Sequence, residues 1–343
     1  MTVNRRSFLK AAAAGGAVVA AGAIAPRVFG SEHTGHNGTS AAGGAHMHGG
    51  HPGGFAVERQ QPRAMTPMEY LTHFHWGDKV TQRADGTALR EYTITSHPQT
   101  LEVAKGVTFP GWVFSTPTIG GMAPGPTLRA REGDTIRIVY RNTDKHPHSM
   151  HFHGIHPGNQ DGVFELVPEG GEQVYEFTAE PFGVHLYHCH TLPITKHLSK
   201  GLFGTLIIDP AEPREQATEM VMMMNGWDVD FDGANEFYTV NGIANYYNEH
   251  PIRLKVGEKV RIYLVNVTEF DLINSFHLHA NFFKYYPTGT RLDNWEFTDT
   301  IIQGQGQRGI LEFAYKHPGK YFFHAHVNEF AELGWVGLFE VVP

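Results

Sequence analysis

The chain has 343 residues, a length that suits two domains of ordinary size, each with its own buried core. Hydrophobic residues make up 41% and charged residues 18%, as in a globular protein, and the formal net charge of -8 leaves no basic excess for a phosphate backbone. Nucleic-acid binding is therefore not expected, whereas 23 histidines beside a single cysteine indicate metal chemistry rather than a disulfide.

The N-terminus has the pattern of an export signal. Arg5 and Arg6 precede an apolar run from Ala11 to about Ala25, which is too short for a good membrane span. This resembles a twin-arginine signal, whose route carries folded proteins and so suits a protein loaded with a cofactor before export. The alternative is an ordinary secretion signal with a chance arginine pair. We expect residues 1–30 to be a signal peptide and the mature protein to be periplasmic or secreted, without a membrane span.

Residues 31–63 shift to Gly, Ala, His and Pro, a composition that cannot bury a core and predicts a flexible linker. The segment also carries imidazole and thioether side chains of the kind that suit copper: His33, His36, His46, Met47, His48 and His51. A copper-collecting role and a solvated tail with incidental histidines both remain open.

From residue 64 onward, short runs rich in β-branched and aromatic residues are separated by Gly, Pro and Asn, which predicts strands. They lie at 135–142, 173–179, 184–190 and 204–210, and again at 260–266, 273–283, 309–315, 320–326 and 336–342.

The two sets of strands form an internal repeat. The stretch 126–138 resembles 251–262, and each is followed by a strand that ends in Asn and then by a His-x-His pair. We therefore expect an all-β protein of two sandwich domains, residues 64–212 and 213–343, with prolines at the boundary.

Four His-x-His pairs occur in strand-like contexts: His151/His153, His188/His190, His277/His279 and His324/His326. Alternate residues of a strand point to the same face, so each pair presents two imidazoles side by side. A single pair can be an accident of core or surface packing. Four pairs at matching places in two repeats instead predict a metal cluster.

Cys189 stands between two histidines, so strand alternation directs its sulfur to the opposite face from both rings. A thiolate with two imidazoles and a weak axial group forms a blue copper electron-transfer site. His148 and His197 are the nearest further imidazoles. The alternative reading is a buried, inert cysteine.

The stretches 148–154 (HSMHFHG) and 188–202 (HCHTLPITKHLSKGL) resemble the copper signature of multicopper oxidases, in particular the two-domain small laccases. The resemblance covers roughly residues 112–343 and implies two cupredoxin-like Greek-key domains. It also implies four coppers per subunit. His148, Cys189 and His197 would hold type 1 copper, His151 and His277 type 2 copper, and the type 3 pair would be held by His153, His188, His190, His279, His324 and His326.

Two departures from the family pattern stand out. Position 202, where many members have an axial Met, is Leu202, which has no lone pair to give to copper and predicts a raised potential. An ungapped alignment of the second repeat puts Asn274, Ala325 and Leu333 where the type 1 ligands would be. We therefore expect one type 1 site, in the first domain.

The resemblance implies reduction of O2 to water with electrons from a small donor, which would approach through an exposed edge of His197. Electrons would then pass along Cys189 to the flanking histidines. Oxygen reduction consumes protons, so nearby carboxylates are expected, and Asp161 and Glu329 are the candidates. Their alternatives are a loop-capping Asp and a solvated Glu. Two-domain relatives complete the trinuclear site between subunits, which implies a homotrimer.

Two other functions remain as alternatives. One is a copper nitrite reductase, although that family lacks the second His after the Cys and has Asp where this chain has His151. The other is a non-enzymatic periplasmic copper-binding or electron-transfer protein, which leaves the eight paired histidines unexplained. The donor is open among phenols, Cu(I), Fe(II) and Mn(II). The methionine run 220–224 suggests either Cu(I) binding or, more simply, core packing.

Overall fold

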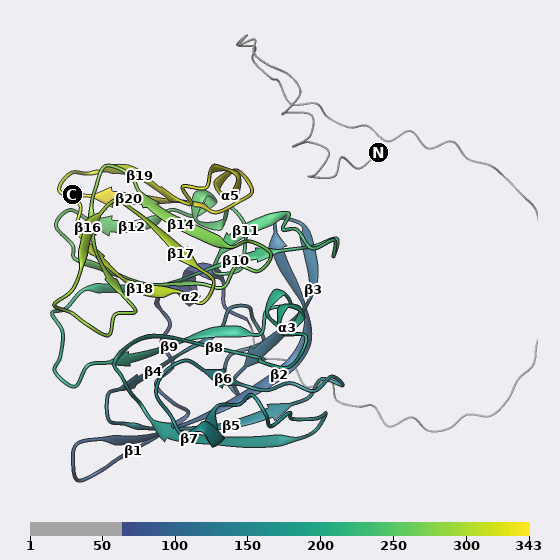
Figure 1. Ribbon diagram of the computed structural model, residues 1–343. Helices are drawn as coiled ribbons and strands as arrows, with labels where there is room; N and C mark the ends of the chain where they lie inside the picture. Colours follow the sequence, from purple (N-terminus) through teal and green to yellow (C-terminus); the bar gives the residue numbers. More distant parts are fainter. Residues whose placement is uncertain (1–63) are drawn as a thin grey trace, which may run out of the picture. The chain divides into compact units, whose positions relative to one another are not determined.

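The computed structural model describes residues 64–343; the expected signal peptide and linker, residues 1–63, lie outside the described part. The described chain consists of strands joined by loops and short helices, which confirms the all-β prediction (Figure 1). Among residues 64–343, no helix is both long enough and apolar enough to cross a membrane.

The first sandwich has two sheets. One follows the order β1-β2-β5-β7 with β3 paired to β2, and its strands are β1 (Lys79–Gln82), β2 (Ala88–Ala104), β3 (Val107–Ser115), β5 (Thr135–Asn142) and β7 (Glu172–Thr178). The other follows the order β4-β9-β8-β6 and contains β4 (Gly125–Arg131), β6 (His151–Phe152), β8 (Gly183–His188) and β9 (Phe203–Asp209). Along β5, Ile136, Ile138 and Tyr140 alternate with more exposed residues, so one face of this strand packs into the core.

The second sandwich also has two sheets. One follows the order β11-β10-β13-β18-β15-β16, with β10 (Thr218–Trp227), β11 (Phe237–Val240), β13 (Val260–Asn266), β15 (Phe283–Pro287), β16 (Glu296–Thr298) and β18 (Arg308–Phe313). The other follows the order β12-β20-β19-β14-β17, with β12 (Ile252–Lys255), β14 (Ile273–Leu278), β17 (Thr300–Gly304), β19 (Gly319–His324) and β20 (Val336–Val342).

The two sandwiches share one topology. In the first, β2 pairs in parallel with β5, which is antiparallel to β7; in the second, β10, β13 and β18 repeat these relations. The sheet order β4-β9-β8-β6 likewise matches β12-β20-β19-β14. The strands paired in parallel are separated in sequence by other strands, as Greek-key connections require. The predicted internal repeat is therefore present in the strand order itself.

Short helices occupy the loops: α2 (Pro67–Thr72), the 3-10 turn η1 (Gly158–Gln160), α3 (Ile194–Ser199), α4 (Tyr246–Glu249) and α5 (Asn328–Glu332). Helix α2 begins with a capping box in which Thr66 and Glu69 bond reciprocally. Leu71 belongs to the core of the second sandwich, and the Tyr247 hydroxyl donates to the Pro67 carbonyl at 2.6 Å. The start of the segment expected to form the first domain thus packs against the second.

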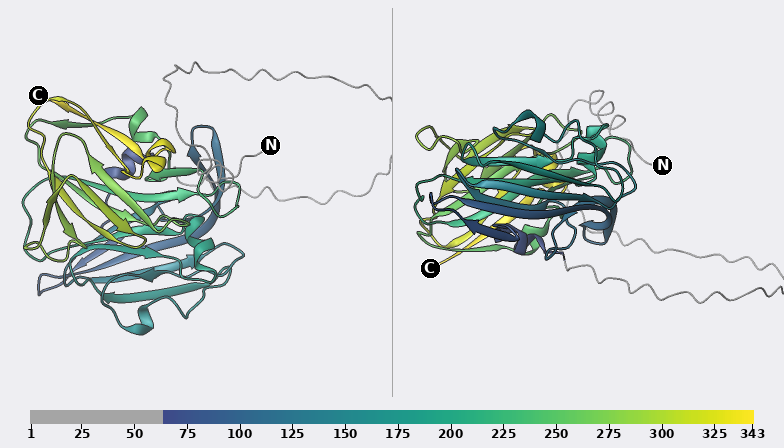
Figure 2. Two further views of the ribbon diagram at one scale, coloured as in Figure 1. Left: turned by 45° about the horizontal axis from the view of Figure 1, so that its top comes forward. Right: turned by 90° about the horizontal axis from the view of Figure 1, so that it is seen from below.

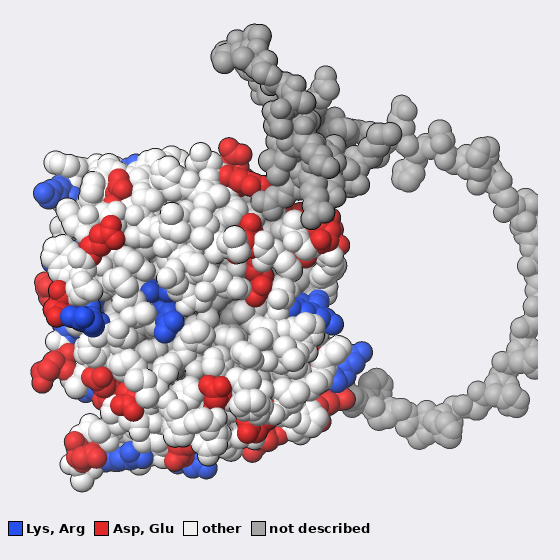
Figure 3. Space-filling view, in the orientation of Figure 1, with Lys and Arg blue, Asp and Glu red and all other residues white. Residues whose placement is uncertain are grey.

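The two sandwiches meet along β8 and β9 on one side and β10, β13 and β18 on the other (Figures 1 and 2). Apolar residues from both form one buried cluster, which includes Val184, Ile207, Val221 and Met223. The four methionines of the 220–224 run are all buried in core clusters, which favours the packing interpretation over Cu(I) binding. On the face drawn in Figure 3, acidic and basic side chains are scattered rather than gathered into one patch.

Candidate metal centre

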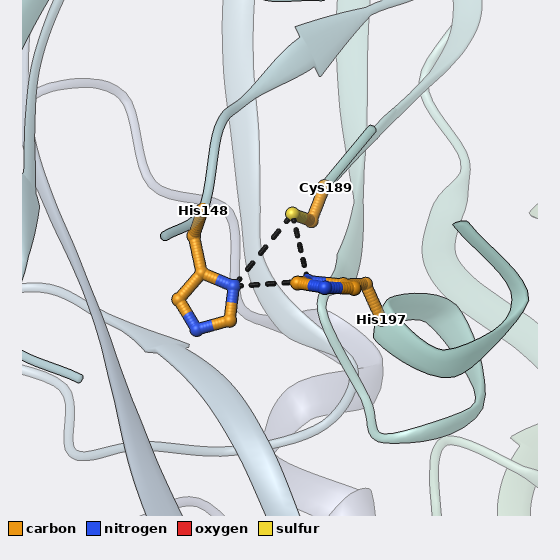
Figure 4. Close-up of side chains that lie close together, drawn as sticks. All are labelled: His148, Cys189 and His197. Carbon is orange, nitrogen blue, oxygen red and sulfur yellow. Dashed lines mark hydrogen bonds between the residues drawn. The ribbon is translucent and has the colours of Figure 1, made fainter. Parts of the chain in front are cut away.

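Cys189, His148 and His197 converge in the first sandwich (Figure 4). The Cys189 sulfur lies 3.3 Å from Nδ1 of His197 and 3.8 Å from Nδ1 of His148, and the two Nδ1 atoms are 3.0 Å apart. These spacings suit one ion about 2 Å from each donor atom. The set of one soft sulfur and two imidazole nitrogens fits copper.

Asp144, which was not predicted from the sequence, orients His148 by binding the ring nitrogen that does not face Cys189. Its buried carboxylate lies 3.0 Å from Nε2 of His148 and also contacts His146. Burial alone would raise the pKa of Asp144, but the hydrogen bonds from His148 and His146 outweigh it and lower that pKa. With its Nε2–H donated to Asp144, His148 keeps Nδ1 free for a metal.

The environment keeps both imidazoles neutral, which is the form that binds metal. Burial lowers the pKa of His148, and burial together with His148 lowers the pKa of His197 to about 4. Burial also raises the pKa of the Cys189 thiol, while the backbone N–H of Ser149 donates to the sulfur at 3.4 Å. Leu202 is fully buried, and its carbonyl accepts from the Cys189 N–H at 3.0 Å.

Four histidines form a second group in the first sandwich: His151, His153, His188 and His190. His151 is central to it, because β6 and β8 pair it directly with His188 and its ring centroid lies 5.1 to 5.3 Å from the other three. Nε2 of His153 lies 3.3 Å from Nε2 of His188. The four rings therefore face a common point.

Backbone carbonyls set the tautomers in this group. Nδ1 of His151 lies 2.9 Å from the Asp161 carbonyl, and Nδ1 of His188 lies 3.0 Å from the Cys189 carbonyl, so each Nδ1–H donates and each Nε2 is left unprotonated. Burial lowers the pKa of His188 to about 4 and, together with His188 and Arg308, lowers the pKa of His153 to about 3.

The second sandwich repeats the arrangement with His277, His279, His324 and His326. The pairing of β14 with β19 places His277 opposite His324, and the centroid of His277 lies 5.0 to 5.3 Å from the other three. Nε2 of His279 lies 2.9 Å from Nε2 of His324. The two groups are equivalent in geometry as well as in sequence.

The tautomers are fixed in the same way in this second group. Nδ1 of His277 lies 2.9 Å from the Asp299 carbonyl, and Nδ1 of His324 lies 2.7 Å from the Ala325 carbonyl. Asp299 is thus the counterpart of Asp161. Sequence reasoning missed it because it lies in a strand-to-strand turn far along the chain from His277, whereas Asp161 follows its histidine closely.

The expectation that each His-x-His pair lies within a strand is wrong in detail. Strands β6, β8, β14 and β19 end at Phe152, His188, Leu278 and His324. The last histidine of every pair therefore lies just beyond its strand. The rings still gather on one side, because the one or two residues that follow each strand keep its alternating direction.

Of the two expected carboxylates, Asp161 lies at the histidine groups. Its carboxylate is 3.2 Å from Nδ1 of His151 and 3.7 Å from Nε2 of His156. Glu329 lies in the first turn of α5, shortly after His326, and its residue is exposed. The structure therefore brings Asp161 into direct contact with a candidate ligand.

The two histidine groups are separate within the chain, and among residues 64–343 no ring contact or hydrogen bond joins them. Each lines its own surface pocket, of about 580 Å³ in the first sandwich and about 650 Å³ in the second. Exposed apolar side chains lie beside both, including Ile155 near the first and Phe282 and Phe297 near the second.

The second sandwich also contains the counterpart of the Cys189 site. The Ala325 N–H donates to the Trp335 carbonyl, and the Trp335 N–H donates to the Phe330 carbonyl, as Cys189 donates to Leu202 and Leu202 to His197. Phe330, not Leu333, is therefore the counterpart of His197. The ungapped alignment was wrong because the second loop is shorter by three residues (13 from Cys189 to Leu202, 10 from Ala325 to Trp335).

The expected exposed edge of His197 is not present. His197 is only 4% exposed, because Trp112 covers it with a ring centroid 4.9 Å away. The Trp112 ring also contacts His146 and His148, each at a centroid distance of 5.0 Å.

These features together define a cupredoxin-type copper-binding protein: two Greek-key sandwiches, one buried Cys-His-His site and two matched groups of four histidines. The fold alone does not reveal the reaction, but the donor sets restrict the metal.

Comparison with known proteins identifies the family. Two sequence models of multicopper oxidases match residues 104–213 and 213–343. A crystal structure described as a multicopper oxidase is 48% identical, with a TM-score of 0.78, and the match covers 81% of this chain and 98% of that one. The chain belongs to the multicopper oxidase family, which implies copper as its metal and confirms the resemblance seen in the motifs.

Other relatives are more distant. The copper-containing nitrite reductase of Neisseria gonorrhoeae is 26% identical over 249 residues, which cover 66% of this chain and 62% of the reductase. A copper resistance protein A homologue of Pseudomonas syringae is 36% identical over 140 residues, 39% of this chain and 23% of that protein. The chain thus spans less than two thirds of these proteins. A twin-arginine signal model matches residues 2–22 and confirms the predicted export to the periplasm.

Proposed function

We propose that the protein is a laccase-like, two-domain multicopper oxidase that couples one-electron oxidation of a small donor to the reduction of O2 to water. The observation that carries this proposal is the pair of equivalent four-histidine groups, one of them connected through adjacent residues to Cys189. Bound copper supplies the electron storage and the oxygen chemistry, and the protein supplies ligands, spacing and protons.

The ligand sets follow from the geometry and the resemblance. Cys189, His148 and His197 would hold type 1 copper, with Leu202 at the axial position. His151 and His277, the central histidine of each group, would hold type 2 copper. The type 3 pair would be held by His153, His188, His190, His279, His324 and His326. The Nε2 atoms of His151, His188 and His324 suit metal binding, because the Nδ1–H groups of these rings are already donated to carbonyls and Nε2 is left unprotonated.

We further infer a homotrimer in which the first histidine group of one subunit meets the second group of its neighbour. Each group is open to the surface, and exposed apolar residues accompany both: Ile155, beside the first, is 62% exposed and Phe297, beside the second, is 63% exposed. Exposed apolar side chains of this size mark protein interfaces. A contact between two different faces of one chain is heterologous, and it forms a closed ring when the rotation between neighbouring subunits closes. The number of subunits comes from the family resemblance.

Asp161 and Asp299 have a shared role in this scheme, since their carbonyls orient the two central histidines. The Asp161 carboxylate is also placed to hold and pass a proton, because it lies within 3.7 Å of both His151 and His156. Glu329 remains a candidate for proton delivery near His326 on position alone.

Nitrite reduction is the second candidate, favoured by the similarity to copper-containing nitrite reductases. Two residues argue against it: His190 supplies an imidazole after Cys189, and His151 occupies a position where that family has Asp. Both differences add ligands for a cluster that nitrite chemistry does not need.

The test is steady-state oxygen uptake by the copper-loaded protein with hydroquinone as donor. We expect about four copper ions per chain and about four donor electrons consumed per O2, with water as the product. Peroxide as the main product would contradict the proposal. Nitrite turnover without oxygen uptake would establish the second candidate instead.

A further inference from the structure

A pocket of about 460 Å³ opens to the surface directly beside the Cys189 site. Its aromatic and charged lining comes from Trp112, His146, Lys196 and Lys200, and none of the residues lining it is acidic. This volume lies in the range of small-molecule sites. The pocket is therefore large enough for a single-ring aromatic molecule.

Trp112 separates this pocket from the candidate copper ligands. The ring lines the pocket on one side and contacts both His148 and His197 on the other, while those two histidines are themselves buried. A donor held in the pocket would touch Trp112 rather than either ligand. Trp112 is thus the residue that would contact both a molecule in the pocket and the two candidate copper ligands.

Two lysines flank the same ring. The ammonium groups of Lys196 and Lys200 lie 5.4 and 5.5 Å from the Trp112 ring centroid. Lys200 is held in place, because its ammonium donates to the Pro110 carbonyl at 2.8 Å and lies over Phe109. Lys196 is exposed. Asp144, which contacts the pocket residue His146, is buried and already bonded to His146 and His148.

We propose that this pocket is the donor site, and that Lys196 and Lys200 make it selective for anionic, electron-rich aromatic molecules over cations. The inference deepens the proposed oxidase function and rests on it. An aromatic ring can stack on Trp112 while its anionic group pairs with a lysine. A free Cu(I), Fe(II) or Mn(II) ion would meet two like charges and find no carboxylate among the lining residues.

The chemistry balances with the proposed reaction. Each catechol or phenol donor loses one electron to the site behind Trp112 and one phenolic proton to solvent. Four such losses, with four protons, match one O2 reduced to two waters. The pocket need only hold the donor against Trp112, so charge selectivity should affect donor binding more than the maximal rate.

The test compares two catechols that differ in the charge of a side chain, dihydroxyphenylacetate and dopamine. For the wild-type, copper-loaded protein at low salt, we expect a lower KM for the anion, and the preference should shrink at high salt. Lys196→Gln should reduce the KM ratio of cation to anion by roughly fivefold. Lys196→Arg should retain it. Equal KM values for both catechols, or a preference unchanged in Lys196→Gln, would overturn the inference.

A matched control removes the charge of a lysine that lies outside the pocket. The Lys105 side chain is 86% exposed, and Lys105 does not line the pocket, so Lys105→Gln should leave the KM ratio unchanged. If Lys105→Gln changed the ratio as much as Lys196→Gln, the selectivity would come from overall charge and the pocket would be excluded as its source.

A second readout does not depend on turnover. Calorimetric titration with phenylacetate and with phenethylamine, which lack the oxidisable hydroxyls, should show binding of the anion only, and Lys196→Gln should weaken it. Binding of phenethylamine alone would refute the inference. Failure of the oxidase proposal looks different: no donor, including hydroquinone, would support oxygen uptake, although phenylacetate binding would persist.

Discussion

The two sandwiches share a backbone arrangement at one place and use it for opposite purposes. In the first, the loop after β8 positions the side chains proposed to bind copper; in the second, the loop after β19 repeats the same backbone hydrogen bonds around buried side chains that include neither a thiol nor an imidazole. The three positions that converge in the first are His148, Cys189 and His197, and their counterparts are Asn274, Ala325 and Phe330. The fold itself therefore does not need a metal at this place, and the side chains alone decide whether one can bind.

The hydrogen-bond partners of His148 and of its counterpart Asn274 also differ. In the first sandwich the buried Asp144 accepts from His148, whereas in the second Thr268 occupies its place and accepts from Asn274 at 2.9 Å. A buried carboxylate costs free energy unless it is paired. At this position a buried carboxylate is therefore present only in the sandwich with the candidate imidazole ligands.

The largest effect should come from removing the sulfur. Cys189→Ser replaces a soft ligand with a hard one, so the blue absorption should vanish and oxygen uptake should fall by at least about a thousandfold. The matched change Ala325→Ser should leave both intact. Blue colour in Cys189→Ser, seen by absorption and electron paramagnetic resonance spectroscopy, would place the type 1 site elsewhere.

The core of the second sandwich can be destabilised without changing the Cys189 site. Trp335 is fully buried and takes the place of Leu202, so Trp335→Ala should lower the free energy of unfolding by about 3 to 5 kcal/mol. The type 1 spectrum should stay the same. Chemical denaturation measures the loss, and a spectrum that changed along with stability would mean that the two regions are coupled.

A smaller effect is expected from changing Asp144, the hydrogen-bond partner of His148. Asp144→Asn removes a negative charge that favours the oxidised site, so the type 1 potential should rise, and type 1 copper should be held roughly 10- to 100-fold less tightly. Thr268→Asn is the control and should change neither. Redox titration and copper retention against a chelator report both effects. A lowered potential would be opposite to this account.

The smallest effect is expected at the axial position. Leu202→Met gives copper a thioether that stabilises the oxidised form, so the potential should fall by about 60 mV, roughly a tenfold shift in a one-electron equilibrium. The blue site should persist. An unchanged or raised potential would show that position 202 is not the axial neighbour.

Much of the fold could be predicted from sequence because the strands of the β-sandwiches have strong periodicity. Strands β5, β13 and β20 begin and end at the residues expected. The long β2, at residues 88–104, was not predicted because its alternation is interrupted by polar residues and Pro98. The packing of α2 on the second sandwich was not predictable from local pattern, since it depends on a contact with a residue 180 positions away in the sequence.

At the site, the histidine spacing was enough to indicate which side chains converge, because pairs in a strand keep their direction. Asp144 and Asp299 were missed, since a lone Asp carries no signal until its hydrogen bond is seen. Trp112 was missed for the same reason, so the sequence did not reveal that its ring covers His197. Leu333 was aligned with His197 by mistake, because an ungapped alignment cannot detect that the loop of the second sandwich is shorter.

The central claim is that neither histidine group works alone and that the groups of neighbouring chains complete each other. Two inactive variants test it: one with His153→Ala and His188→Ala, the other with His279→Ala and His324→Ala. In co-assembled trimers formed from equal amounts, about a quarter of the interfaces would combine two intact groups, so oxygen uptake should return to roughly a quarter of the wild-type rate. Mixed trimers that contain both variants and remain inactive would contradict the claim.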